Sequence, residues 1–462
     1  MNPFRNQSRR RIPPSDVGNE APIALIVTDD RERQEHIAIH LMAKDFVISY
    51  ADFDGDTLRE IPQYAPHVIL VSLSTHVDKA QDIRKVLKSH FADHMPPCIA
   101  IFTEDSNYLS VNTKYFNSVI FPPAHASQIA TRVDSLLRLN MMEIEIIRRI
   151  ETLRETFGIH HTLSDDIATR PYRILFIGKA SPEFMVIINA LQEKNVEVVA
   201  AFTTFTAFDY LHESEFDAVV MNALVDSEPA MTICETMRRN SKLYHVPSLF
   251  LVKDDTFDEH EKAFAKGARD IIYCNSETAE INGRILELAN YHRIHSQLKQ
   301  EFDDIGNNAC LDDASKTYNS EFFSAHMRRV CKDVRTQGQF LGLITLKIWP
   351  NDAYNISSQS LDQANAKIGG MIKSMVRMQD ITARISTDTF MIAIIDETHT
   401  NISIITKRLQ GVIEAATFQD ATKNGKAFTV KLTLNTSQLT ASENSDRLIT
   451  RSLVAIETET AA

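Results

Sequence analysis

The sequence predicts an α/β chain of three parts, in which two doubly wound parallel sheets precede an α+β domain. Short, continuous apolar runs alternate with helix-length segments through the first two parts, which is the pattern of parallel strands covered on both faces. The runs recur after about 150 residues, which indicates an internal duplication. From residue 306 the order of helices and strands changes. A length of 462 residues suits roughly three domains.

Residues 21–158 and 170–305 are the two predicted repeats, each an α/β sheet followed by a linker helix. The order of apolar strands and helix-length segments is typical of flavodoxin-like doubly wound domains. The expected strands lie at 23–27, 68–71, 98–102 and 119–121 in the first repeat, and at 174–177, 218–221, 249–252 and 271–273 in the second.

The linker helix at the end of each repeat carries an apolar residue at every third or fourth position. The first stripe runs from Leu139 to Phe157 and the second from Tyr291 to Ile305. Such stripes usually pack against another element. They could build a helical stalk, or join two copies of the chain if a stripe stays exposed. We therefore expect a homodimer.

The third part, residues 306–458, combines helical patterns with a few apolar strands. This order fits an α+β domain, and an apolar content of 44% is enough to fill the cores of all three parts. The strands are expected at 341–346, 390–395 and 427–434.

Charge and hydropathy exclude several classes of function. The net charge is −12, which argues against binding of nucleic acid or of anionic membranes, because affinity for phosphates comes from clustered Lys and Arg. The one basic cluster lies in residues 1–20, which we expect to form a disordered tail. No apolar run reaches the ~18 residues of a membrane span. No apolar core follows the N-terminal charges, so we expect neither membrane insertion nor a signal peptide.

The cysteines are scattered along the chain without a Cys-x-x-Cys motif. Such spacing suits reduced, mostly buried thiols in a cytoplasmic protein. The five cysteines are Cys98, Cys234, Cys274, Cys310 and Cys331.

Residues at the ends of the predicted strands make both repeats resemble response-regulator receiver domains. Such domains need an acidic pair for Mg²⁺, an aspartate that accepts a phosphoryl group, a hydroxyl that senses it and a lysine that pairs with it. In the first repeat Asp29-Asp30 matches the acidic pair and Thr103 the hydroxyl, but Ser72 replaces the acceptor and Pro122-Pro123 the lysine. Without a third carboxylate, we expect Asp29 and Asp30 to be a vestigial acidic loop, with a weak Mg²⁺ site as the alternative.

The second repeat retains none of these receiver residues. Gly178-Lys179 replaces the acidic pair, Asn222 the acceptor, Val252 the hydroxyl and Cys274 the lysine. Asparagine cannot take a phosphoryl group, and Lys179 could stand electrostatically where the metal would be. We interpret both repeats as unphosphorylated platforms that dock protein partners.

The third part resembles a GGDEF domain, the catalytic domain of diguanylate cyclases. Ser386-Thr387-Asp388-Thr389-Phe390 lies where the family has Gly-Gly-Asp/Glu-Glu-Phe, so both glycines and one acid are lost. The family's two metal-binding aspartates fall at Thr345 and Lys347, and its phosphate-binding lysine falls at Pro350. One carboxylate cannot hold two Mg²⁺ ions. We therefore expect no enzyme activity, no catalytic cofactor and no Mg²⁺.

An Arg-x-x-Asp motif, Arg377 to Asp380, precedes this degenerate hairpin. Arg377 lies nine residues before Ser386, which is the family's spacing for its inhibitory site for cyclic di-GMP. Arginine can hold O6 and N7 of a guanine, or a phosphate, in forked geometry, and aspartate can accept from the N1–H and N2–H₂ edge. Arg408 falls at the position of a further arginine of that site. The resemblance thus implies a retained site of Arg377, Asp380 and Arg408; the alternative is a surface Arg–Asp pair that caps the hairpin.

The order receiver, receiver, GGDEF resembles that of PleD-like regulators, and the lost hairpin resembles their PopA-type members. The resemblance implies a non-catalytic cyclic di-GMP effector at a cell pole, which recruits adaptors or protease-delivery factors in cell-cycle control. A ligand-independent scaffold is the main alternative. A divergent cyclase is a further one, and the missing carboxylate at Thr345 argues against it. Asp362 falls where the family holds guanine, so it is either a relic of GTP binding or an ordinary aspartate at a helix start.

Overall fold

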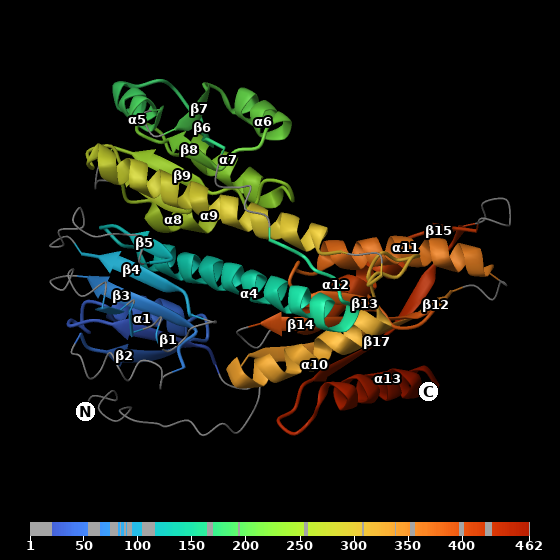
Figure 1. Cartoon of the computed structure of the whole chain (residues 1–462). Coiled ribbons are helices and arrows are strands. Elements are labelled where there is room, and N and C mark those ends of the chain that lie inside the picture. The colour runs from blue at the N-terminus through green and yellow to red at the C-terminus, as the bar shows by residue number, and fades with distance from the viewer. Residues whose placement is uncertain are drawn as a thin grey trace.

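The computed structural model of the chain has three sheets joined by long helices (Figure 1). It describes residues 21–461 apart from 54–64, 74–81, 84, 87–88, 90–94, 104–115, 164–169, 193–194, 254–256, 307–308, 338, 352–355, 397–401 and 421–426. The predicted N-terminal tail, with its basic cluster, lies outside the described residues.

The first repeat contains a five-stranded parallel sheet in the order β2-β1-β3-β4-β5. This confirms the predicted parallel sheet, and the strand order is that of flavodoxin-like folds. β1, β3 and β4 are buried along their whole length, as their continuous apolar sequences predict. The elements are β1 (Ile23–Val27), α1 (Glu35–Met42), β2 (Val47–Ala51), β3 (Val68–Leu73), β4 (Cys98–Phe102), β5 (Ser118–Ile120) and α4 (Ala126–Phe157).

The second repeat has the same parallel topology, with the order β10-β9-β8-β6-β7. α5 packs beside α9, while α7 packs beside α8, so helices cover the sheet as in other doubly wound folds. The elements are β6 (Tyr172–Ile177), α5 (Pro182–Gln192), β7 (Val196–Ala201), α6 (Thr204–Glu213), β8 (Ala218–Asn222), α7 (Glu228–Arg239), β9 (Ser248–Val252), α8 (His260–Lys266), β10 (Asp270–Tyr273) and α9 (Thr278–Asp304).

β2 and β7 are strands that the apolar runs did not reveal. Each lies at an edge of its sheet, and most of its residues are only half-buried. These two edge strands are covered incompletely, so their sequences mix polar residues such as Ser49 and Glu197 with apolar ones. The other edge strands, β5 and β10, are fully buried, so the continuous apolar pattern identified them as well as the central strands and missed only the two half-exposed ones.

The C-terminal part is built on a mixed sheet in the order β11-β13-β14-β12-β17. β12 is the longest strand and pairs antiparallel with both β14 and β17. The strand expected at 427–434 is divided at Thr429, and β13 was not predicted. The elements are β11 (Tyr318–Asn319), α10 (Ser320–Gln337), β12 (Phe340–Pro350), α11 (Ser358–Met375), β13 (Ile381–Arg384), β14 (Thr389–Asp396), α12 (Ile402–Ala415), β15 (Phe418–Gln419), β16 (Ala427–Phe428), β17 (Val430–Gln438) and α13 (Ser445–Ala461).

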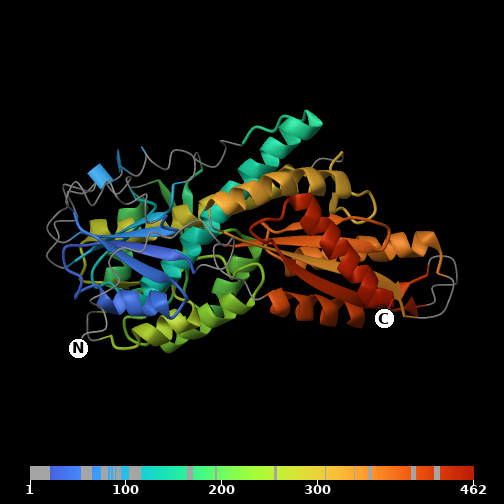
Figure 2. The same ribbon diagram turned by 90° about the horizontal axis from the view of Figure 1, so that it is seen from below.

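The apolar stripes of both linker helices pack largely against other elements of the chain. α4 and α9 pack against each other, and the far half of α4 packs against α10 (Figures 1 and 2). Leu139, Ile146 and Leu153 share one core with Phe302 and Ile305. Tyr291, Ile294 and Leu298 of the second stripe are only half-buried, so the homodimer stays a prediction.

The two repeats contact each other through their last strands and the helices that follow. Arg132 of α4 forms an ion pair with Glu287 of α9 at 2.8 Å, and Gln128 donates to Asp270 at 2.7 Å. Arg284 of α9 donates to the carbonyl oxygen of Pro122 at 2.9 Å. These buried polar contacts join the repeats into one N-terminal unit.

Two further observations concern the chain as a whole. Four of the five cysteines are buried and Cys274 is half-buried, and all five are free thiols. Among the described helices, none is both long and apolar enough to cross a membrane.

Candidate ligand-binding site

The Arg-x-x-Asp motif forms a tight turn between α11 and β13. The carboxylate of Asp380 accepts a hydrogen bond from the backbone N–H of Arg377 at 2.8 Å. The backbone N–H of Asp380 donates in return to the carbonyl oxygen of Arg377 at 3.1 Å. The two motif residues thus hold each other in place, and the chain reverses direction from helix to strand within four residues.

The side chains of Arg377 and Arg408 reach the surface beside this turn. Arg377 is 46% exposed and forms an ion pair with Asp396 at the end of β14. Arg408, from α12, is exposed and donates to the carbonyl oxygen of Met375, two residues before Arg377. The structure therefore brings the three predicted residues to one place, although Arg408 lies on a separate helix.

Asp380 differs from the expectation of an open acceptor, because its side chain is buried. Burial raises its pKa to about 7, against the opposing influence of Arg377. Its Oδ1 atom is buried and has no hydrogen-bond partner among the described residues. An unpaired buried carboxylate oxygen is costly, and because this atom is buried, a donor that a ligand brings reaches it only when the turn opens.

The inner side of the turn is held by α4, a helix of the first repeat. Nη2 of Arg149 lies 3.2, 3.3 and 3.2 Å from the carbonyl oxygens of Met378, Gln379 and Asp380. Arg149 is buried, and no local sequence pattern indicated it. The contact spans more than two hundred residues of chain.

The degenerate hairpin, Ser386 to Phe390, is organised by Arg384. Arg384 donates to the carbonyl oxygens of Ser386 at 3.2 Å and of Thr387 at 2.8 Å. Its guanidinium also pairs with Asp312 at 3.1 Å and with Asp362 at 3.2 Å. Asp362, which was either a relic of GTP binding or an ordinary aspartate at a helix start, is thus engaged by a side chain of the protein itself.

The predicted metal positions are filled by groups that do not bind metal. Thr345 is fully buried in the middle of β12. Nζ of Lys347 lies 3.8 Å from the Asp388 carboxylate and 4.7 Å from the centre of the Trp349 ring. A lysine ammonium therefore neutralises the carboxylate that is left in the hairpin.

The receiver-like edge of the first repeat has a hydrogen-bonded pair at the acceptor position. Ser72 is buried, and its hydroxyl oxygen accepts from Nε2 of Gln34 at 3.0 Å. Asp30 accepts from the backbone N–H of Arg33, so it closes a turn before α1. Within the described ranges no three His, Cys, Asp or Glu side chains gather as a metal site would require.

In the second repeat Asn222 ties two loops together. Its Nδ2 donates to the main-chain carbonyl oxygen of Lys179 at 2.7 Å, and its Oδ1 accepts from the N–H of Leu224 at 3.1 Å. Gly178 has φ of +126°, and a Cβ atom there would lie 2.7 Å from the Cβ of Asn222. Lys179 touches the acceptor position through its backbone, not through the ammonium that was expected to replace the metal.

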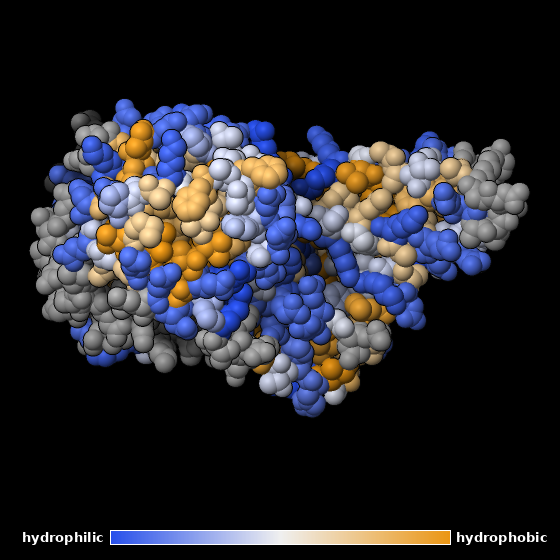
Figure 3. Space-filling view, turned by 90° about the horizontal axis from the view of Figure 1, so that it is seen from above, coloured by the Kyte–Doolittle hydropathy of each residue, from blue (hydrophilic) through white to orange (hydrophobic). Residues whose placement is uncertain are grey.

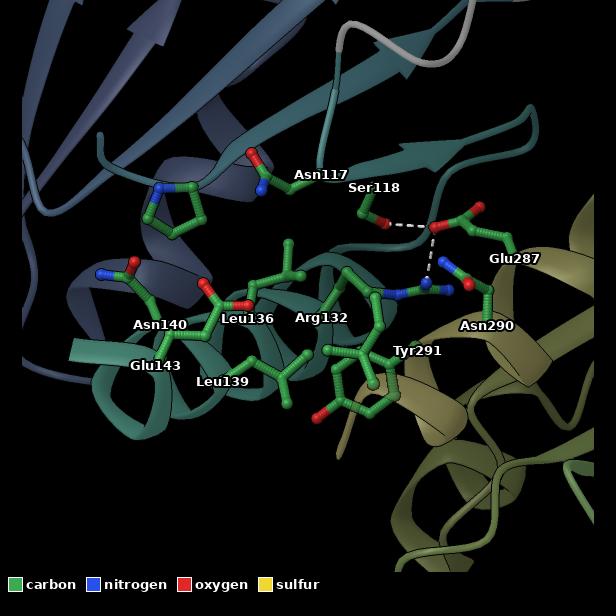
Figure 4. Close-up of a pocket in the computed structure, with 12 residues that line it drawn as sticks. Asn117, Ser118, Arg132, Leu136, Leu139, Asn140, Glu143, Glu287, Asn290 and Tyr291 are labelled. Atoms are coloured by element: carbon green, nitrogen blue, oxygen red, sulfur yellow. Dashed lines mark hydrogen bonds and ion pairs between the residues drawn. The ribbon is translucent and has the colours of Figure 1, made fainter. Parts of the chain in front are cut away.

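A small cavity lies between the two repeats, among α4, α9 and the end of β5 (Figure 4). Its volume is about 90 Å³, which is space for about three water molecules. The Arg132–Glu287 ion pair borders it, and burial raises the pKa of Glu287. A dinucleotide is far too large for this cavity.

Comparison with known proteins identifies the C-terminal part. Residues 309–458 match the family described as diguanylate cyclase, GGDEF domain, and this part of the chain is a GGDEF domain.

Three solved structures are similar to it at low sequence identity. The FimX GGDEF domain from Pseudomonas aeruginosa is 15% identical, with 32% of this chain and 92% of that chain covered and a TM-score of 0.29. The coiled coil and GGDEF domain of DgcB from Caulobacter crescentus, in complex with c-di-GMP, is 15% identical, with 38% and 93% covered and a TM-score of 0.31. The diguanylate cyclase SiaD in complex with its activator SiaC, from Pseudomonas aeruginosa, is 14% identical, with 40% and 72% covered and a TM-score of 0.29.

Proposed function

We propose that this chain is a non-catalytic receptor for cyclic di-GMP that acts as an adaptor for protein partners. The observation that carries the proposal is the meeting of Arg377, Asp380 and Arg408 at one turn. The ligand offers two guanine edges and two phosphates, which match exposed guanidinium groups beside a carboxylate that lacks a partner on one oxygen. Each charge-assisted hydrogen bond contributes roughly 1.5–3 kcal/mol.

The condition of the hairpin supports a receptor without cyclase activity. Lys347 takes the place of a metal beside Asp388, and Arg384 engages Asp362. Two-metal phosphoryl chemistry needs carboxylates that hold both ions. The turn at Arg377 keeps its charged groups, whereas the hairpin keeps one acid, Asp388, which Lys347 neutralises, and this contrast favours ligand sensing over synthesis.

The surface of the second repeat supports the adaptor role. Phe202 and Phe205, at the start of α6, are 61% and 78% exposed, and Val225, after β8, is 99% exposed. All three lie at the carboxyl edge of the parallel sheet, where Asn222 replaces a phosphate acceptor. Figure 3 shows apolar side chains gathered over this repeat. Exposed apolar patches of this kind mark protein interaction sites.

The biological setting within the proposal follows the PopA-type resemblance. The two N-terminal repeats would be degenerate receiver domains that recruit delivery factors for regulated proteolysis in cell-cycle control, at a cell pole. Ser72 bonded to Gln34 leaves no carboxylate to phosphorylate, so ligand binding, not phosphorylation, would be the input.

Calorimetric titration of cyclic di-GMP into the full chain tests the receptor. We expect saturable binding that Arg377→Ala and Arg408→Ala each weaken at least tenfold. Arg447→Ala, which removes an exposed arginine of α13, should bind as the unmodified chain does. Absence of binding by the unmodified chain would establish the ligand-independent scaffold instead. Incubation of the chain with GTP and Mg²⁺ should give no cyclic di-GMP. Formation of cyclic di-GMP would instead support the divergent cyclase.

A photoreactive residue in place of Phe205 tests the adaptor in cells. We expect it to cross-link one protein partner, whereas the same residue in place of Val454, which is 55% exposed on α13, should not capture that partner. Equal capture at both positions would contradict the docking role of the second repeat.

A further inference from the structure

α4 links the first repeat to the GGDEF domain through a dense set of ion pairs. Arg148 pairs with Asp333 of α10 at 3.0 Å, and Arg329 of α10 pairs with Glu151 at 2.6 Å and also with Glu155. The two helices lie side by side in both ribbon views (Figures 1 and 2). The first repeat therefore reaches the GGDEF domain along a rigid helix of 32 residues.

One arginine of α4 continues this contact to the ligand turn. The guanidinium of Arg149 donates through Nε to Glu145 at 2.8 Å and through Nη2 to the carbonyl oxygens of residues 378, 379 and 380. It also lies over the ring of Phe302, 4.6 Å from its centre. A buried group with this many partners has one orientation, so it fixes the backbone it holds.

The acid behind Arg149 is itself held by the GGDEF domain. Glu145 lies 3.1 Å from Nε2 of His326 on α10, and Nδ1 of His326 lies 2.9 Å from the hydroxyl of Thr152. Burial alone would raise the pKa of Glu145, yet His326 and Arg149 lower it to about 2. The acid is therefore ionised, and it orients the guanidinium toward the turn.

We propose that Arg149 is a positioning residue of the cyclic di-GMP site, so that the affinity of the site depends on how α4 of the first repeat docks on the GGDEF domain. This inference rests on the proposed ligand function. Arg149 touches no ligand; it sets the path of residues 378–380 and so the place of the Asp380 carboxylate, which accepts from the backbone N–H of Arg377. By linkage, the ligand stabilises the docked state of α4 by the same factor that docking adds to its affinity.

The site lies in the GGDEF domain, but the residue that positions its turn comes from the first repeat, so ligand binding at the turn would be felt by the repeats. A ligand that orders residues 378–380 strengthens the hydrogen bonds that Arg149 donates to them. Because Arg149 lies on α4, the effect reaches the interface between α4 and α9 at Arg132 and Glu287. The partner-docking repeats would in this way respond to a ligand that binds at the turn of residues 377–380 in the GGDEF domain.

Titration of cyclic di-GMP into three full-length variants tests the inference. Arg149→Lys keeps the charge but cannot donate to three carbonyls and Glu145 together, so we expect at least a tenfold loss of affinity. Arg149→Gln, as a second variant, should lose at least as much. Arg154→Ala, as the control, removes an exposed arginine of α4 whose ion pair with Glu155 lies within the same helix, so it should bind within about twofold of the unmodified chain.

Hydrogen exchange of α4, with and without cyclic di-GMP, separates positioning from a purely structural role. In the unmodified chain the ligand should slow exchange at residues 145–153, and Arg149→Lys should abolish this protection. Binding by Arg149→Lys at unmodified affinity, or tighter, would overturn the inference, since tighter binding means that α4 blocks the turn. Failure of the unmodified chain to bind would instead remove the proposed function itself.

Discussion

Arg384 and Asp362 form an ion pair at 3.2 Å across the region where an active GGDEF domain would receive its nucleotide. Arg384 is 9% exposed, and the same guanidinium holds Asp312 and two hairpin carbonyls. The arginine therefore stabilises a hairpin that has lost both of its glycines. Its role is structural, and its removal has a measurable cost.

Arg384→Ala should lower the free energy of unfolding of the GGDEF domain by about 3 kcal/mol, because it leaves Asp312 largely buried without its partner. Trp349 is the only tryptophan of the chain and lies in β12 of this domain, so its fluorescence in urea reports the domain alone. Lys407→Ala, an exposed change on α12, is the control and should shift the midpoint little. Equal midpoints for both variants would show that the hairpin does not need Arg384.

Restoration of the hairpin by Ser386→Gly, Thr387→Gly and Thr389→Glu together should not restore cyclase activity. The metal site would still lack the carboxylate at Thr345, and Lys347 would still occupy the space beside Asp388. Chromatography of a reaction with GTP and Mg²⁺ checks for cyclic di-GMP. Product from this triple variant would mean that fewer carboxylates suffice than two-metal chemistry implies.

Ligand affinity should rise with pH through neutrality. Burial raises the pKa of Asp380 to about 7, and only the ionised carboxylate accepts from both donors of a guanine edge. The ionised fraction rises about tenfold from pH 6 to pH 8 for such a pKa, and affinity should follow it. Calorimetry at both pH values checks this, with Asp380→Asn as the pH-independent control. A flat profile in the unmodified chain would mean that Asp380 does not contact the ligand as a carboxylate.

The second repeat should lose stability in acid. His245 stacks on His292 and His295, with ring centres 5.1 and 5.6 Å apart. Burial and the neighbouring histidines lower the pKa of His245 to about 3, and burial and His292 lower that of His295 to about 4, from the ordinary value of 6.5. Between pH 6.5 and 4 the unfolded chain therefore binds more protons than the folded one.

The contribution of these neutral histidines to the free energy of unfolding is thus complete above pH 6.5 and is lost as pH falls toward 4. The free energy of unfolding falls by at most about 1.4 kcal/mol per pH unit for each histidine. Urea unfolding at pH 7.5 and pH 5, followed by far-ultraviolet circular dichroism, measures the change. His245→Gln should reduce the difference between the two pH values. If the stability difference between pH 7.5 and pH 5 is the same in His245→Gln as in the unmodified chain, groups other than His245 cause the loss of stability in acid.

The fold was predictable where apolar periodicity is local. β1, β3, β6 and β8 are buried strands with continuous apolar sequences, and their recurrence after about 150 residues indicated the duplicated sheet. β2 and β7 were missed because these two edge strands are half-exposed and mix polar residues with apolar ones. The linker stripes were predictable as packing surfaces, but their partners were not, since an apolar stripe does not specify which apolar surface covers it.

The candidate site was likewise predictable only in its local features. The spacing of Arg377, Asp380 and the hairpin is a local property of the chain, and so are the losses at Thr345 and Lys347. The burial of Asp380 and the pairing of Asp362 with Arg384 depend on neighbours from other elements, and they changed the expected chemistry of both acids. Arg149 gave no sequence signal, because an arginine on an amphipathic helix is ordinarily a solvated residue.

The sequence by itself determined the parallel sheets and the place of the Arg-x-x-Asp turn, because each depends on residue type and short-range spacing. Only the tertiary structure decided that α4 docks on α10, that Arg149 holds the turn from the first repeat, and that the linker stripes are covered within the chain. These contacts join residues up to 231 positions apart, and such pairings depend on the shapes of folded surfaces that no local pattern encodes.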